Sequence, residues 1–200
     1  TFEELYRDEI ESHAVELAHH AAEAESVLGQ ERLVRYSIMA GEQALAAYAW
    51  EEALACFQRA LAAKEGQPGD HEQAALHFGL GKAQVALLQM RDARASLTRA
   101  FEYYVELLDI ANAVNVAEYP VEYGSTGVPE LILRALQLVP NDSHEAGRLL
   151  SHHAFNLGHR KGDDEGAQEA FKQALAIALR EGDQALEMWT LARAGRVDLY

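Results

Sequence analysis

Apolar residues recur at spacings of three and four positions along almost the whole chain, which is the pattern of amphipathic helices. The pattern predicts an N-terminal helix over residues 3–27 and further helices over about 31–48 and 51–64. After the breaker Gly66-Gln67-Pro68-Gly69, it predicts a helical hairpin over about 71–105. Pro is scarce, and Ala, Leu, Glu and Gln are abundant, so local propensity agrees with the pattern. The sequence therefore predicts an all-α fold.

The second half of the chain repeats this arrangement less regularly. Residues 107–140 are predicted as a degenerate hairpin with a long glycine-bearing connection at 123–127, and residues 144–180 as a regular one. Residues 183–200 then form half of a further hairpin. Because repeat arrays usually end in a capping unit, we expect more repeats or another domain to follow in the natural protein.

A triplet of small, large and small residues marks the second helix of three hairpins. It consists of Ala53, Phe57 and Ala60, then Ala93, Leu97 and Ala100, then Ala167, Phe171 and Ala174. Gly41 and Gly81 stand twelve residues before the first two triplets, and the same 40-residue step joins Phe155 to Gly195. Small residues let two helix backbones approach, and the large residue fills the space beyond. We therefore predict that these positions pack the helices of each hairpin together.

The Leu80-Gly81 pair followed by Ala-x3-Leu resembles the tetratricopeptide repeat (TPR), and Ala40-Gly41 fits the same motif. The third hairpin departs from it with Ala154-Phe155. The resemblance implies one right-handed α-solenoid of TPR-like hairpins over residues 1–200.

A closer resemblance lies in Glu16–His20, Ala40–Ala44 and Tyr48–Ala53. These segments are similar to the helical-repeat arms of large bacterial signal-transduction proteins, in which a P-loop NTPase precedes the arm and a LuxR-class helix-turn-helix or a cyclase lies elsewhere. The resemblance implies a sensor or regulatory arm that binds a protein or peptide segment, within its own polypeptide or outside it. The alternative is a structural repeat protein that associates with itself through exposed ends. The single cysteine, Cys56, cannot form an internal disulfide, so the cytoplasm is the expected location.

In the TPR family, residues three before and one after the crossing position line the concave groove. Transferred to this chain, that register selects Ile38, Glu42, Phe78, Lys82, His152, Asn156, Ala192 and Arg196, with Trp189 and Tyr200 nearby. Ile38 and Glu42 stand where carboxylate-clamping TPR domains use Lys and Asn, which disfavours binding of a chaperone tail. A mixed apolar and charged groove suits an amphipathic helix or an internal segment. The alternative for Ile38 and Phe78 is that they only pack on neighbouring helices.

Charge and candidate chemistry point away from other functions. The net charge of -15 repels nucleic acid and anionic membranes, and no apolar stretch is long enough to span a bilayer. His19-His20 and His152-His153 are adjacent pairs, which point about 100° apart on a helix and do not favour a shared metal ion. Gly79-Leu80-Gly81-Lys82 lacks the spacing of a phosphate loop. Cys56 lies on an apolar helix face without a paired base. We therefore expect no enzyme activity, metal or cofactor.

Overall fold

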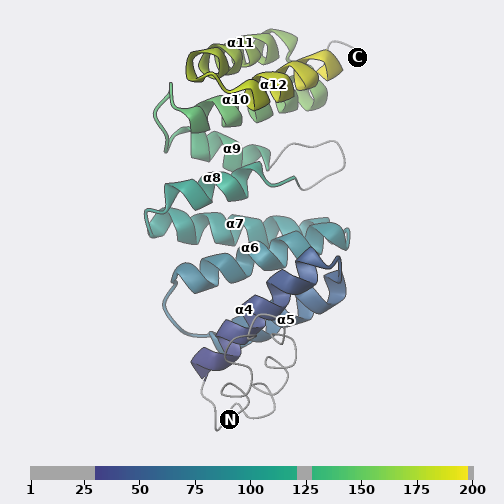
Figure 1. Cartoon of the computed structure of the whole chain (residues 1–200), viewed down its shortest axis with the longest axis vertical. Coiled ribbons are helices and arrows are strands. Elements are labelled where there is room, and N and C mark those ends of the chain that lie inside the picture. The colour runs from purple at the N-terminus through teal and green to yellow at the C-terminus, as the bar shows by residue number, and fades with distance from the viewer. Residues whose placement is uncertain (1–29, 121–127, 198–200) are drawn as a thin grey trace. The chain divides into compact units, whose positions relative to one another are not determined.

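The computed structural model describes residues 30–120 and 128–197, and within these ranges it contains helices and no strand (Figure 1). The helices are α4 (Gln30–Ala46), α5 (Trp50–Ala63), α6 (His71–Ala86), α7 (Met90–Glu106), α8 (Ile110–Glu118), α9 (Pro129–Leu136), α10 (His144–Asn156), the π-helical turn η1 (Leu157–Lys161), α11 (Asp164–Glu181) and α12 (Gln184–Val197). The all-α prediction is confirmed. The predicted helix over 3–27, the connection at 123–127 and Tyr200 lie outside the described residues.

The chain divides into two compact units, and the division follows Tyr103 inside α7. In the first unit, α4 packs on α5 and both contact α6. In the second unit, α8 packs on α9, and α10 contacts α9, α11 and α12. Helices that are neighbours along the chain are thus neighbours in space within each unit.

The ring of Phe57 fills the space between α4 and α6 in the first unit. A Cβ atom added to Gly41 would lie 2.7 Å from a ring carbon of Phe57, and one added to Gly79 would also meet that ring. At the next crossing, a Cβ at Gly81 would lie 2.8 Å from the side chain of Leu97. Real Cβ atoms do not approach other carbons so closely, so each large side chain packs directly on glycine backbone.

The alanines of all three triplets are 0% exposed, which agrees with close helix packing at these positions. In the second unit, Phe155 stands at the crossing position and packs with Phe171 in a buried cluster. Gly158, one turn later, accommodates Val197, and Gly147 lies against Ile177 and Leu186. The close approaches of this hairpin are therefore made at other glycines of α10 and η1.

Three turns between helices share one conformation. Tyr48, Leu88 and Leu108 adopt positive φ angles of 60°, 60° and 59°. The amide of the following residue donates to a carbonyl five positions back in each turn, as from Ala49 N to Ala44 O at 2.8 Å. This bond belongs to the Schellman motif, in which a left-handed residue ends the helix. Gly182 occupies the same position between α11 and α12 with φ 67°.

The next helix often begins with an aspartate or serine cap. Side-chain oxygens of Asp70, Asp109, Ser143, Asp163 and Asp183 accept hydrogen bonds from backbone amides in the first turn of α6, α8, α10, α11 and α12. These caps satisfy amides that have no partner inside the helix.

Among the described residues, no helix combines the length and the apolar character that a membrane crossing requires.

Candidate functional site

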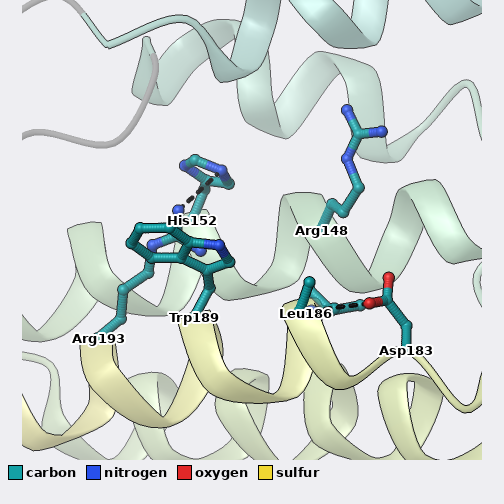
Figure 2. Close-up of a pocket in the computed structure, with 7 residues that line it drawn as sticks. Arg148, His152, Asp183, Leu186, Trp189 and Arg193 are labelled. Atoms are coloured by element: carbon teal, nitrogen blue, oxygen red, sulfur yellow. Dashed lines mark hydrogen bonds between the residues drawn. The ribbon is translucent and has the colours of Figure 1, made fainter.

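A pocket of about 310 Å³ opens between α10 and α12 in the second unit (Figure 2). Its lining consists of Arg148, His152, Asp183, Ala185, Leu186, Trp189 and Arg193. Arg148 and His152 lie one turn apart on α10, while Leu186, Trp189 and Arg193 follow one side of α12. The close packing of α10 on α12 brings these two rows of side chains together.

Arg193 is held in the pocket by uncharged groups. Its Nη1 donates to Ser151 Oγ at 2.9 Å, and its Nη2 lies 3.2 Å from His152 Nε2. Ser151 Oγ also accepts from Thr190 Oγ1 at 3.0 Å, and both hydroxyl residues are fully buried. Among the described residues, no carboxylate lies within ion-pair distance of this guanidinium. The pocket therefore contains a positioned cation whose charge is not paired by direct contact.

The contact with Arg193 also assigns a hydrogen-bonding role to His152 Nε2. A guanidinium can only donate hydrogen bonds, so His152 Nε2 acts as the acceptor in this contact. Burial lowers the pKa of Arg193, and attraction to the carboxylate of Glu118 opposes this shift. Arginine remains protonated in proteins, so the pocket keeps this positive charge at neutral pH.

The other arginine of the pocket is paired. Arg148 Nε donates to Glu118 Oε1 at 3.1 Å, and its Nη2 contacts the second carboxylate oxygen. The same Nη2 is 3.4 Å from Asn115 Oδ1. The hydrogen bonds to Glu118 raise the pKa of Arg148. This planar two-bond pairing fixes α10 against α8 and makes Arg148 a rigid wall of the pocket.

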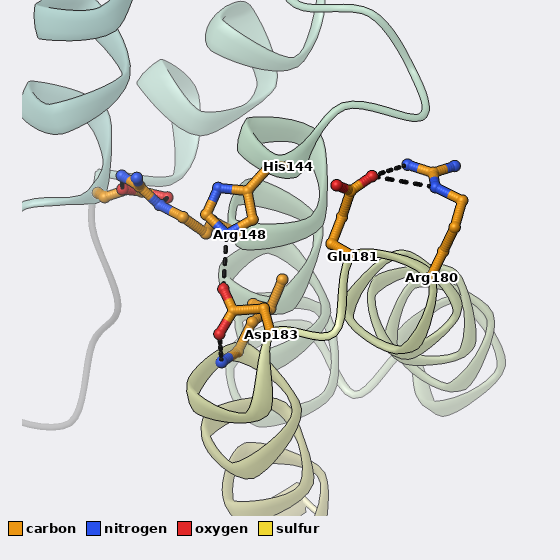
Figure 3. Close-up of polar contacts among 7 residues, drawn as sticks. His144, Arg148, Arg180, Glu181 and Asp183 are labelled. Carbon is orange, nitrogen blue, oxygen red and sulfur yellow. Dashed lines mark hydrogen bonds and ion pairs between the residues drawn. The ribbon is translucent and has the colours of Figure 1, made fainter.

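The acidic residue at the rim is also engaged. Asp183 Oδ2 lies 2.6 Å from His144 Nε2, and Oδ1 accepts from Leu186 N at 3.0 Å (Figure 3). The backbone bond from Leu186 and the bond from His144 lower the pKa of Asp183. Nearby, Arg180 pairs with Glu181 at 2.9 Å. The carboxylate of Asp183 thus caps α12 and ties it to α10.

Trp189 supplies the apolar part of the site. Its side chain stands on α12 beside the pocket and is 63% exposed (Figure 2). A large aromatic ring in this position offers both contact area and an indole N–H. The pocket can therefore take an anionic group at Arg193 and an apolar group at Trp189.

The predicted groove residues of the second unit do not lie together. His152 and Trp189 line the pocket. Asn156, one turn beyond His152, is only 3% exposed and lies in the interior. The guanidinium of Arg196 lies 5.1 Å from the ring centroid of Phe155, and Ala192 is exposed on another side of α12.

The predicted groove residues of the first unit form a smaller group on α4 and α6. Lys82 Nζ lies 4.0 Å from the ring centroid of Phe78. Burial lowers the pKa of Lys82, and the exposed Glu42 opposes this shift through its charge. Ile38 packs against the core around Phe57, as the packing alternative for this residue predicts.

Sequence reasoning missed Arg148, Arg193, Asp183 and Leu186. The sequence could have indicated two of them, since Arg148 stands four residues before the predicted groove residue His152, and Arg193 stands four residues after Trp189. Residues four apart share a helix face, so extending the predicted groove by one turn finds both arginines. Asp183 and Leu186 lie outside that register, and their place depends on how α12 begins.

Within the described ranges, no group of three or more His, Cys, Asp or Glu side chains is arranged to hold a metal ion. Comparison with protein-family models, with curated proteins and with solved structures gives no match to this chain.

Proposed function

We propose that this chain is a protein-interaction scaffold that binds an extended peptide segment in the pocket between α10 and α12. An acidic group of the peptide contacts Arg193, and an adjacent apolar side chain packs on Trp189. The observation that carries the proposal is the half-buried guanidinium of Arg193, which has no carboxylate partner, beside the exposed indole of Trp189. Trp and Arg are the residue types most enriched among the energetic centres of protein interfaces.

The wider part of the proposal places the pocket in a right-handed solenoid of TPR-like hairpins. The sequential packing of neighbouring helices and the triplet alanines support it. The role as a cytoplasmic regulatory arm of a bacterial signalling protein rests on the resemblance of residues 16–53 and on the single buried free thiol, Cys56. An NTPase encoded in the same reading frame would support this role, whereas a short stand-alone frame would remove it.

Selection from a random peptide library displayed on phage tests the binding function. The purified chain should enrich peptides in which Asp or Glu stands next to an aromatic or aliphatic residue. Synthetic copies of the enriched peptides are then titrated against the wild type and against Trp189→Ala and Arg193→Gln. Each variant should bind at least about tenfold more weakly, since each loses a central contact.

The control is Met188→Ala, which truncates a neighbouring exposed apolar residue outside the pocket lining. It should bind the selected peptides as the wild type does. Failure to enrich any sequence, or equal binding by Trp189→Ala and the wild type, would contradict the proposal.

A further inference from the structure

Glu118 of α8 holds one of the two arginines that line the pocket between α10 and α12. Arg148 Nε donates to Glu118 Oε1 at 3.1 Å, and Arg148 Nη2 contacts the second carboxylate oxygen. The side chain of Glu118 is only 12% exposed, so salt and water screen this pair weakly. The guanidinium of Arg148 extends away from α12, while that of Arg193 lies beside His152 (Figure 2). The charge of Arg148 is therefore neutralised before any ligand arrives.

The charge of Glu118 also acts on Arg193. Its attraction opposes the fall in the pKa of Arg193 that burial causes, although Arg193 itself contacts Ser151 and His152. Arg148 in turn feels the charges of Glu145 and Asp183 as well as that of Glu118.

These charges limit what the pocket can hold. One negative charge of a ligand can pair directly with Arg193, because this guanidinium has no carboxylate partner among the described residues. A second negative charge would find Arg148 already paired with Glu118, and it would be repelled by that carboxylate.

We propose that Glu118 is a specificity-determining residue, which limits the pocket to ligand groups with a single negative charge. The carboxylate of Asp or Glu in a bound peptide pairs with Arg193. A phosphorylated side chain brings a second charge, for which the described lining of the pocket has no further unpaired arginine. Phosphate binds well where Arg side chains cluster, and neighbouring carboxylates act against it. The inference rests on the peptide binding proposed above and names the charge class of the ligand.

A purely structural role of Glu118 has a different consequence. If the carboxylate served only to fix α10 against α8, its replacement would weaken the binding of every peptide alike. A role in selecting charge instead changes the ratio of two affinities. The ratio is therefore the quantity to measure.

Two peptides give this ratio. The first is a peptide enriched by the library selection, with its Asp or Glu, and the second carries phosphoserine at that position. Both are titrated at about pH 8, where phosphoserine carries about two negative charges. Binding is followed by the nuclear magnetic resonance signal of the Trp189 indole N–H, which Trp50→Phe distinguishes from the other tryptophan. The wild type should bind the phosphoserine peptide at least about tenfold more weakly.

Three variants test the residue. Glu118→Gln keeps an oxygen that can accept from Arg148 but removes the charge, so the preference should fall below about threefold or reverse. Glu118→Asp keeps the charge and should retain a preference of at least about tenfold, even if both peptides bind more weakly. The control, Glu165→Gln, makes the same change in net charge at an exposed position in the first turn of α11 and should leave the preference unchanged.

The inference alone is overturned if the wild type binds the phosphoserine peptide as tightly as the carboxylate peptide. It is also overturned if Glu118→Gln weakens both peptides by the same factor. The wild-type comparison stands even where Glu118→Gln lowers stability. Failure of the selection to yield any acidic peptide is a different result, because it overturns the proposed peptide binding and this inference with it.

Discussion

Phe57 shows how single residues set the distances between helices in this protein. Its ring contacts the backbone at Gly41 on α4 and at Gly79 on α6, so one side chain serves two crossings. The triplet and the 12-residue offset predicted the contact with Gly41. Nothing in the spacing predicted the contact with Gly79, because it depends on how a third helix packs on the hairpin.

His77 gives a residue-scale prediction about pH. It stacks on Tyr103 with ring centroids 5.8 Å apart, and burial together with the charge of Arg99 lowers the pKa of His77 to about 4. The unfolded chain takes up this proton near pH 6.5, whereas the folded chain does so only near pH 4. The contribution of the neutral imidazole to stability is therefore lost as the pH falls from 6.5 towards 4.

Replacing His77 with Phe keeps an aromatic ring against Tyr103 and removes the titration. Between pH 7 and pH 5, the wild type should lose about 1–2 kcal/mol more of its free energy of unfolding than His77→Phe, after allowance for partial exposure. Urea unfolding at both pH values measures this difference. Equal losses in the two proteins would refute the prediction.

At the scale of helices and turns, the residues that end the helices depart from the usual sequence preferences, whereas the helix interiors follow them. Tyr48, Leu88 and Leu108 take left-handed backbone conformations that usually belong to glycine, and their side chains are 76%, 77% and 83% exposed. A residue with a Cβ atom in this region costs about 1 kcal/mol. These large residues are thus strained and gain little from burial.

Leu88→Gly should therefore stabilise the protein by about 0.5–1 kcal/mol, because it removes the strain in the turn between α6 and α7 without uncovering any core. Thermal and urea unfolding measure the change. The reverse substitution, Gly182→Leu in the equivalent turn, should destabilise the protein by a similar amount. A lower stability for Leu88→Gly would show that the exposed leucine makes a contribution that the turn geometry does not reveal.

At the scale of the whole molecule, charge is the feature that every part shares. The 200 residues carry 32 acidic and 17 basic side chains, and the resulting net charge of -15 favours expansion through self-repulsion. Arg193 is an exception to this acidic character, because it places a positive charge in the pocket between α10 and α12. A pocket of this kind attracts acidic segments at short range, although the mean field of the protein repels them.

Salt should consequently stabilise the folded chain. Raising NaCl from about 10 mM to about 300 mM shortens the screening length from about 30 Å to less than about 10 Å and weakens repulsion between surface carboxylates. The midpoint of thermal unfolding should rise over this range, and KCl should act in the same way because screening does not depend on the cation. A falling midpoint would mean that attractive ion pairs, such as that of Arg148 with Glu118, outweigh the repulsion.

The pattern of residues along the chain is enough to predict the helical class and the residues that bring paired helices together. Helical periodicity is a local property, and the partners Gly41 with Phe57 and Gly81 with Leu97 each lie 16 residues apart within a single hairpin. The pocket and the exposed side of α12 can be recognised only in the tertiary structure. The side chain of Arg193 contacts that of His152, which lies 41 positions earlier in the sequence. The exposure of Gly195 depends on whether another helix packs there. Such features arise from the rotation and spacing of whole helices, which small contributions from many contacts set together, so no single spacing in the sequence reveals them.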